Sequence, residues 1–173
     1  NRNELTKAYD PSVVEEKWYQ IWEKSDSFSP SNDKKSVPFT IMIPPPNVTG
    51  ILHIGHILNN TVQDVLIRHA RMNGKSTLWQ PGTDHASIAT EAKVTKKLQE
   101  RNIKKQKIGR EEFLKHAWEW KRKYGGTILN QLRRMGASCD WSRTKFTLDE
   151  KYSQAVTHAF VKLYNDGLVY RGE

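Results

Sequence analysis

Three consecutive prolines, Pro44 to Pro46, close a short apolar segment and determine how the residues around them can be organised. The segment before them, Phe39 to Ile43 (FTIMI), is apolar and short enough to be a buried strand. Proline has no backbone N–H, so a strand or helix cannot continue through this run. The chain then enters a tight loop, Asn47 to Gly50. We therefore expect a strand that ends abruptly at a polar, glycine-containing loop.

A helix and a second strand are expected after this loop. The helical pattern extends from about Leu52 to Met72, and Gly74 stands where a helix commonly ends. The residues on one side of this helix are Val62, Val65, Leu66 and His69. Residues 76–79 form the next strand candidate. Strand, helix and strand within about 40 residues form a βαβ unit, so the two strands are expected to be parallel.

Further helices are expected on both sides of this unit. Asp10 is a favourable N-cap and Pro11 a favourable first residue, so a helix should begin there. Its predicted apolar stripe consists of Val14, Trp18, Ile21 and Trp22. A polar loop follows at 25–35. Downstream helices are expected at about 87–101, 111–135 and 149–165.

Glycines mark two boundaries in the downstream part. Gly125 and Gly126 are expected to kink or break the middle helix, and Gly167 to end the last one. Leu168 to Tyr170 are then a third strand candidate that extends into the chain end. Such a sheet would be half complete. We therefore expect an α/β fold: the first half of a Rossmann-like nucleotide-binding catalytic domain at 37–173, preceded by an N-terminal helix and loop at 1–36.

Cysteine content and hydropathy exclude several classes of protein. Cys139 is the single cysteine of the 173 residues, which excludes an internal disulfide or a multi-cysteine metal site and indicates a reducing compartment. No apolar run approaches the about 18 residues of a membrane-spanning helix, and the first ten residues are polar. A cytoplasmic location is expected, with an organelle as the alternative.

The positive charge is concentrated in one segment. Of the formal net charge of +9, residues 93–110 contribute +7 through eight bases and one acid, Glu100. The bases are Lys93, Lys96, Lys97, Arg101, Lys104, Lys105, Lys107 and Arg110. Two interpretations are open: a surface for a polyanionic partner, or a solvated and mobile surface segment.

The loop after the first strand carries the candidate chemistry. Ligands of open α/β sheets bind beyond the carboxyl ends of the strands. Gly50 and Gly55 permit close backbone approach there, and a helix start attracts phosphate. His53 and His56 are three residues apart and are expected on one helical face, where imidazole donors can stabilise charge on phosphate oxygens.

Other roles for these histidines are possible. Both can be structural residues with satisfied hydrogen bonds. A metal site with His69 and His85 lacks a carboxylate or cysteine cluster at ligand spacing, so we predict no metal ligand. A dinucleotide-binding loop is disfavoured because the G-x-G-x-x-G pattern is absent there.

These residues resemble a known family. His53-Ile54-Gly55-His56 resembles the HIGH motif of the class I aminoacyl-tRNA synthetases, and the longer string PPPNVTG before LHIGH is similar to the valyl-tRNA synthetases. Isoleucyl and leucyl relatives differ in this loop. Three further segments resemble the valyl family: Gly82–Ala86 with Ile88–Thr90, Gly109–Phe113 and Gly136–Arg143. Residues 102–107 depart from it in being more basic.

The resemblance implies an enzyme that couples valine to ATP, with Mg²⁺, and then to tRNA(Val), with no membrane or DNA partner. It implies catalytic roles for His53 and His56. The implied ATP-binding residues are Pro46, Thr49, Gly50, His53, Gly55, His56 and Asn59. The implied valine-binding residues are Pro44, Pro45, Asn47 and Asp84. From the residues alone, Asp84 can equally be a helix N-cap and the prolines only a strand terminator.

The resemblance also implies what is missing. The editing domain, the second half of the nucleotide fold with its Lys-Met-Ser-Lys-Ser loop and the anticodon-binding helices are not in these 173 residues. We expect that the isolated chain does not aminoacylate tRNA. Three alternatives remain: an isoleucyl or leucyl synthetase, a stand-alone nucleotidyltransferase, and a basic RNA-binding module without catalysis. The tryptophans are interpreted as packing residues and Cys139 as inert.

Overall fold

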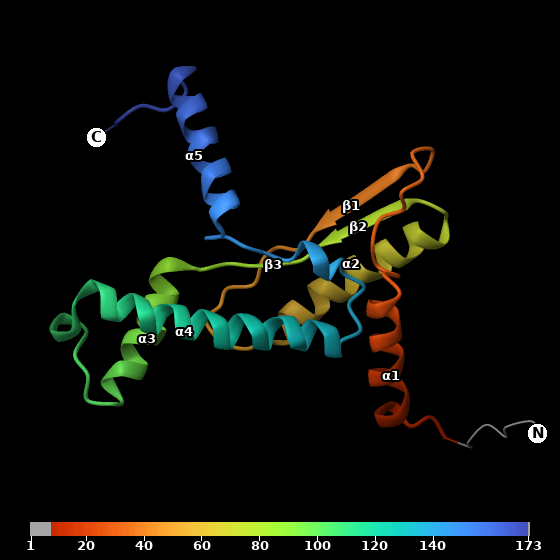
Figure 1. Cartoon of the computed structure of the whole chain (residues 1–173), viewed down its shortest axis with the longest axis horizontal. Helices are drawn as coiled ribbons and strands as arrows, with labels where there is room; N and C mark the ends of the chain where they lie inside the picture. The colour runs from red at the N-terminus through yellow and green to blue at the C-terminus, as the bar shows by residue number, and fades with distance from the viewer. Residues whose placement is uncertain (1–7, 173) are drawn as a thin grey trace, which may run out of the picture.

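The computed structural model describes residues 8–172, which form an α/β arrangement (Figure 1). Residues 1–7 of the predicted N-terminal unit (1–36) and residue 173 of the predicted half domain (37–173) lie outside the described residues. The elements in chain order are α1 (Pro11–Lys24), β1 (Pro38–Met42), α2 (Ile54–Met72), β2 (Ser76–Gln80), β3 (Gly82–Thr83), α3 (Ser87–Gln99), α4 (Lys105–Arg134), the 3₁₀ turn η1 (Trp141–Arg143), β4 (Lys145–Phe146) and α5 (Glu150–Asn165).

The predicted βαβ unit is confirmed. β1 and β2 pair in parallel with Ile41 opposite Trp79, and α2 packs against both strands. Gly74 adopts a positive φ of 73°, the left-handed conformation that follows a helix end. The carboxyl ends of both strands therefore point toward the same edge, where the proline-rich loop begins.

The burial of these elements differs from the prediction. β1 is only half buried: Met42 is 65% exposed, and burial is reached at Ile43, just past the strand. Within residues 8–172, β1 pairs with β2 alone, which leaves one edge of β1 open. The predicted apolar side of α2 is likewise exposed at Val62, Val65 and Leu66, and α2 buries Asn60, Ile67 and Ala70 instead.

A second parallel pair, β3 with β4, was not predicted. It joins Gly82 to Lys145 and Thr83 to Phe146. The third strand predicted at 168–170 is wrong, because these residues lie in no strand and are largely exposed. Gly167 ends α5 as predicted, with a φ of 73°. The additional strand of this part of the chain is therefore β4, which precedes α5.

The predicted break at Gly125 and Gly126 is also wrong. α4 continues through both glycines, and its non-helical residue is Gly109, with φ 72° and ψ 173°. Gly125 is buried, and a Cβ placed there would lie 3.8 Å from a methyl group of Val48. The small residue lets α4 pass close to the loop after β1.

Two clusters of buried side chains hold these elements together. The larger one lies between the βαβ unit and the C-terminal half of α4 and consists of Ile43, Val48, Leu52, Ile67, Trp79, Ile128, Leu132, Ala137, Cys139 and Phe146. The smaller one joins α3 to the N-terminal half of α4 and consists of Val94, Leu98, Phe113 and Trp120. The α3–α4 pair therefore has a core of its own.

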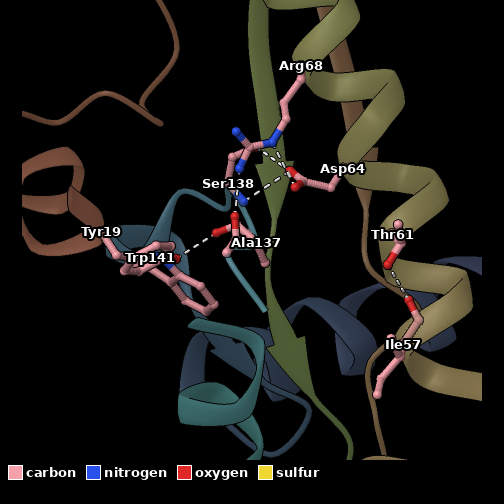
Figure 2. Close-up of polar contacts among 9 residues, drawn as sticks. Tyr19, Ile57, Thr61, Asp64, Arg68, Ala137, Ser138 and Trp141 are labelled. Atoms are coloured by element: carbon pink, nitrogen blue, oxygen red, sulfur yellow. Dashed lines mark hydrogen bonds and ion pairs between the residues drawn. The ribbon is translucent and has the colours of Figure 1, made fainter. Parts of the chain in front are cut away.

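Helix α1 begins as predicted but is attached by a different residue. The Asp10 carboxylate accepts a hydrogen bond from the backbone N–H of Ser12, 3.0 Å away. Trp18 and Ile21 of the predicted stripe are exposed, and the buried residue is Tyr19. Its hydroxyl donates to the carbonyl of Ala137 at 2.6 Å and accepts from the indole N–H of Trp141 (Figure 2). Burial raises the pKa of Tyr19, so the hydroxyl stays protonated.

A polar network fixes the segment after α4 on α2. Figure 2 shows Asp64 of α2 directed toward Ser138 and Arg68. Its carboxylate accepts a hydrogen bond from the backbone N–H of Ser138 at 3.1 Å and forms an ion pair with Arg68. Arg68 also donates to the carbonyl of Gly136. The neighbouring Cys139 is fully buried, and burial raises the pKa of its thiol, which disfavours the reactive thiolate. No helix within residues 8–172 is long and apolar enough to cross a membrane.

Candidate functional site

The loop after β1 is held beside the segment after β2. The backbone N–H of Val48 donates to the carbonyl of Asp84 at 2.9 Å, and that of Asp84 donates to the carbonyl of Pro46 at 2.8 Å. These bonds form a short parallel bridge between Asn47 and Asp84. The structure thus brings together two predicted groups of site residues that are separated by more than 30 positions in the sequence.

Helix α4 holds the same loop from its other side. The indole N–H of Trp120 donates to the carbonyl of Val48 at 2.7 Å, and the side-chain oxygen of Gln131 accepts from the backbone N–H of Leu52 at 2.9 Å. Gln131 was not predicted as a site residue, and Trp120 was predicted to serve packing alone. No local pattern reveals these roles, because each depends on which turn of a distant helix faces the loop.

The predicted valine-binding residues lie along one exposed edge. Pro44, Pro45 and Asn47 are exposed, whereas Pro46 is buried beneath them. The side chain of Asp84 is 35% exposed. Asp84 is not the N-cap of α3, because that position belongs to Ala86, whose φ of 46° is left-handed. The edge therefore presents two proline rings, an amide and a carboxylate to solvent.

The two predicted catalytic histidines cap the start of α2. His53 is the N-cap residue, and its Nδ1 accepts from the backbone N–H of Gly55 at 3.1 Å. His56 lies one turn on, and its Nδ1 accepts from the backbone N–H of His53 at 3.3 Å. The ring centroids are 3.9 Å apart. Because His53 precedes the helix, the pair meets through reciprocal capping rather than by projecting from one helical face.

This capping fixes the chemical state of the two rings. An Nδ1 that accepts a backbone N–H carries no proton, so the proton of each neutral ring lies on Nε2. Partial burial, and secondarily the nearby His53 ring, lower the pKa of His56 and favour the neutral form. Within residues 8–172, no hydrogen bond engages Nε2 of either ring. Two N–H donors therefore point away from the caps at a helix start, which suits the binding of phosphate oxygens.

The remaining predicted nucleotide-binding residues surround this helix start. A Cβ at Gly55 would lie 3.1 Å from Cε1 of His53, so a side chain there would press on the His53 ring. Thr49 and Gly50 are partly exposed in the loop. Asn59 is exposed on the first turns of α2 and accepts from the side-chain amide of Gln63. All of them are within the segment that links the carboxyl end of β1 to α2.

A third segment, unpredicted as part of the site, reaches Asp84 from β4. The hydroxyl of Thr147 donates to Oδ1 of Asp84 at 3.2 Å and accepts from the backbone N–H of His85 at 2.9 Å. A Cβ at Gly82 would lie 2.9 Å from the carbonyl oxygen of Lys145, so β3 and β4 approach as closely as a glycine allows. We call the residues 44–48, 82–85 and 145–147 the site corner.

Metal-ligating side chains are not gathered in the described part of the chain. No group of three or more His, Cys, Asp or Glu residues in positions 8–172 is arranged to hold a metal ion. His69 contacts Asn73, and His85 contacts Thr147. The histidines considered for a metal site thus take part in separate local contacts.

The basic segment at 93–110 forms the tip of the α3–α4 pair, and we call it the basic hairpin. Most of its lysine and arginine side chains are exposed. Two are engaged: Lys105 pairs with Glu91, and the ammonium of Lys97 lies 5.7 Å from the ring centre of Trp120. The hairpin bends at Gly109, and the smaller buried cluster packs the two helices that carry it, so its charges are presented on an ordered surface.

This chain is similar in sequence to a family of known proteins. The family model of the tRNA synthetases class I (I, L, M and V) matches residues 17–173. The chain is 61% identical over 169 residues to a valine–tRNA ligase of Bacteroides fragilis and 58% identical over 171 residues to that of Fusobacterium nucleatum. These alignments cover 98% and 99% of this chain, but the chain spans only 19% of the length of each relative.

A solved structure has a similar fold. It is the LeuRS of Agrobacterium radiobacter, solved as a ternary complex with tRNA and LeuAMS, with a TM-score of 0.77 and 22% identity. The similarity covers 96% of this chain and 20% of that one. At this identity the likeness concerns the fold, and it confirms the α/β arrangement of parallel strands and helices with a leading helix.

Proposed function

Because the chain belongs to the class I tRNA synthetases (I, L, M and V), we propose that it is the first half of the catalytic domain of a valine–tRNA ligase. The proposed half domain occupies 37–173, and residues 1–36 would be a separate N-terminal unit in front of it. The complete protein would activate valine with ATP and transfer it to tRNA(Val) in the cytoplasm.

The observation that carries this proposal is the bridge between Asn47 and Asp84. It places a partly exposed carboxylate beside the proline edge and connects both to the helix start that carries His53 and His56. An amino acid and a nucleotide phosphate are the two ligands that such neighbouring groups suit. The choice of valine rests on the names of the relatives at about 60% identity.

Each part of the edge has a proposed role for valine. The Asp84 carboxylate would pair with the ammonium group of the substrate, which is a charge-assisted hydrogen bond. The rings of Pro44 and Pro45 would form a stiff wall for the branched side chain, with Asn47 at its margin. Such a wall excludes larger amino acids by size and excludes threonine poorly, because threonine has nearly the shape of valine.

The helix start has the complementary role for ATP. In the activation step a carboxylate oxygen of valine attacks the α-phosphorus, and the bond to pyrophosphate breaks. The Nε2–H groups of His53 and His56 would donate to phosphate oxygens as negative charge shifts toward the leaving group. Gly55, Thr49, Gly50, Pro46 and Asn59 would shape the nucleotide site. Mg²⁺ would arrive with the phosphates of ATP as part of that substrate.

The basic hairpin supports the RNA part of the proposal. Its exposed cations lie on a pair of helices with a separate core, which suits contact with RNA phosphates independent of base sequence. This observation also favours a second candidate, a basic RNA-binding module without catalysis. The two candidate functions differ in whether the site corner takes part in a catalysed reaction.

Pyrophosphate exchange with the complete protein tests the proposal. We expect exchange of labelled pyrophosphate into ATP that depends on valine, with much weaker exchange for isoleucine and leucine. Exchange that prefers isoleucine or leucine would assign a sibling synthetase. RNA binding without exchange for any of these amino acids would instead support the RNA-binding module.

A further inference from the structure

We propose that Thr147 is a positioning residue that sets the orientation of the Asp84 carboxylate for the substrate ammonium. This inference rests on the proposed function, because it concerns the amino-acid site of the same reaction. Thr147 is the residue just after β4 and lies more than 60 positions from Asp84 in the sequence.

The Thr147 hydroxyl has one proton, and the tautomer of His85 sets where that proton lies. Its oxygen is 2.9 Å from the backbone N–H nitrogen of His85 and 2.5 Å from Nδ1 of the same residue. The backbone N–H can only donate. With Nδ1–H as the second donor, the hydroxyl oxygen accepts twice and its own proton is free for Oδ1 of Asp84, 3.2 Å away. All three groups are then satisfied at once.

These hydrogen bonds place the two oxygens of the Asp84 carboxylate in different environments. Oδ1 accepts from the Thr147 hydroxyl and from the backbone N–H of Ala86 at 3.0 Å, and Nδ1 of His85 also lies 3.3 Å from Oδ1. Within residues 8–172, no hydrogen bond or ion pair engages Oδ2. With Oδ1 held, the partly exposed Oδ2 is left as the acceptor for an ammonium group.

The backbone of Thr147 is fixed as firmly as its hydroxyl. Its N–H donates to the carbonyl of Thr83 at 3.2 Å, which continues the β3–β4 pairing. The absence of a side chain at Gly82 lets the two strands approach this closely. The position of the hydroxyl relative to Asp84 is therefore set by the sheet.

The test measures amino-acid activation by the complete protein. Thr147→Val removes the hydroxyl and keeps the shape. We expect about a tenfold higher KM for valine in pyrophosphate exchange, because a hydrogen bond to a charged group is lost. The KM for ATP should be unchanged, and Thr147→Ser should restore the KM for valine. The matched control is Thr144→Val, since the Thr144 hydroxyl donates to the carbonyl of Trp141 and does not contact Asp84.

A double-mutant cycle separates positioning from a merely structural role. If Thr147 acts through Asp84, then adding Thr147→Val to Asp84→Asn should change the KM for valine less than twofold. Thr147→Ala serves the same cycle if Thr147→Val does not fold. An unchanged KM in the folded hydroxyl-deletion variant, or the same tenfold effect in the Asp84→Asn background, would overturn the inference. Wild-type protein without valine-dependent exchange would overturn the proposed function itself, and the two failures are thereby distinguishable.

Discussion

The site corner and the basic hairpin are both built on α4, but they are stabilised in different ways. The site corner is tied together by backbone hydrogen bonds between three segments and by Trp120 of α4, and Gln131 of α4 holds the adjoining Leu52. The basic hairpin contributes exposed charge and is carried by α3 and α4, which share the smaller buried cluster; Trp120 belongs to this cluster and also bonds the site corner. Rigid polar geometry suits the chemistry of a small substrate, whereas distributed charge suits a large polyanion. We therefore expect the two regions to serve different substrates of one enzyme.

The largest effect is expected from removing the charge of the site corner. Asp84→Asn should lower kcat/KM for valine in pyrophosphate exchange about a thousandfold, because an ammonium group would lose its charged partner in a partly buried site. Asp10→Asn is the control, since asparagine caps a helix about as well as aspartate. Near-normal exchange by the Asp84→Asn protein would separate Asp84 from substrate binding.

The next largest effect is expected at the helix start. His53→Ala should lower kcat in pyrophosphate exchange about a hundredfold, because one donor to the phosphates is removed. His53→Asn keeps an N-cap acceptor but moves the donor, so it should regain stability without regaining the full rate. A purely structural histidine would show the reverse, with the rate restored together with the cap.

Changes in the basic hairpin should leave activation intact and weaken the RNA step. Replacing Lys96, Lys104 and Lys107 with glutamine should lower kcat/KM for tRNA about tenfold at low salt and reduce its salt dependence. Pyrophosphate exchange without tRNA should be unchanged. The control removes the same charge outside the hairpin by replacing the exposed Lys34, Lys35 and Lys151. An equal effect of both sets would make the hairpin an ordinary solvated surface.

Acid should weaken the cap that His56 forms at the start of α2. The folded-state pKa of His56 is lowered, so below the ordinary value of about 6.5 the unfolded chain binds the proton more readily than the folded chain. His56 therefore does not lower the free energy of unfolding at pH 7.5, and this free energy falls as the pH drops below about 6.5. In thermal unfolding, His56→Gln should reduce the loss between pH 7.5 and 5.5, because glutamine at this position also caps and does not titrate. A loss of equal size in both proteins would exclude His56 as its origin.

The smallest effect is expected in α4, between the two regions. Gly126 is exposed in the part of α4 that is continuous after Gly109, and a Cβ there would meet no atom within 4 Å. Gly126→Ala should therefore stabilise the protein by about 0.5–1 kcal/mol in thermal unfolding, through helix propensity alone. Destabilisation would mean that a bend at this glycine is needed after all.

The sequence predicts local structure well and burial poorly. The βαβ unit, the N-cap at Asp10 and the turn at Gly74 follow from short-range chemistry and are confirmed. The apolar side of α2 and the strand β1 are more exposed than their patterns indicate, because burial depends on what packs against them. The break at Gly125 was wrong for the same reason, since that glycine makes room for Val48.

The same limit applies to the candidate site. The loop residues and Asp84 could be named from the sequence, because their types and order resemble a known family. Thr147, Gln131 and the second role of Trp120 could not, because each contact joins segments that are far apart in the chain. A two-residue strand such as β4 leaves no periodicity from which such a contact might be predicted.

Thermal unfolding of the complete protein with a non-hydrolysable valyl-adenylate analogue tests most directly whether the site corner, and not the basic hairpin, binds the amino acid. At about 100 times its dissociation constant the analogue should stabilise the wild type by about 2.7 kcal/mol. The shift should be much smaller with the isoleucyl analogue, lost in Asp84→Asn and kept in the protein with Lys96, Lys104 and Lys107 replaced. Equal shifts with both analogues, or a shift that survives Asp84→Asn and disappears with the hairpin lysines, would contradict the account.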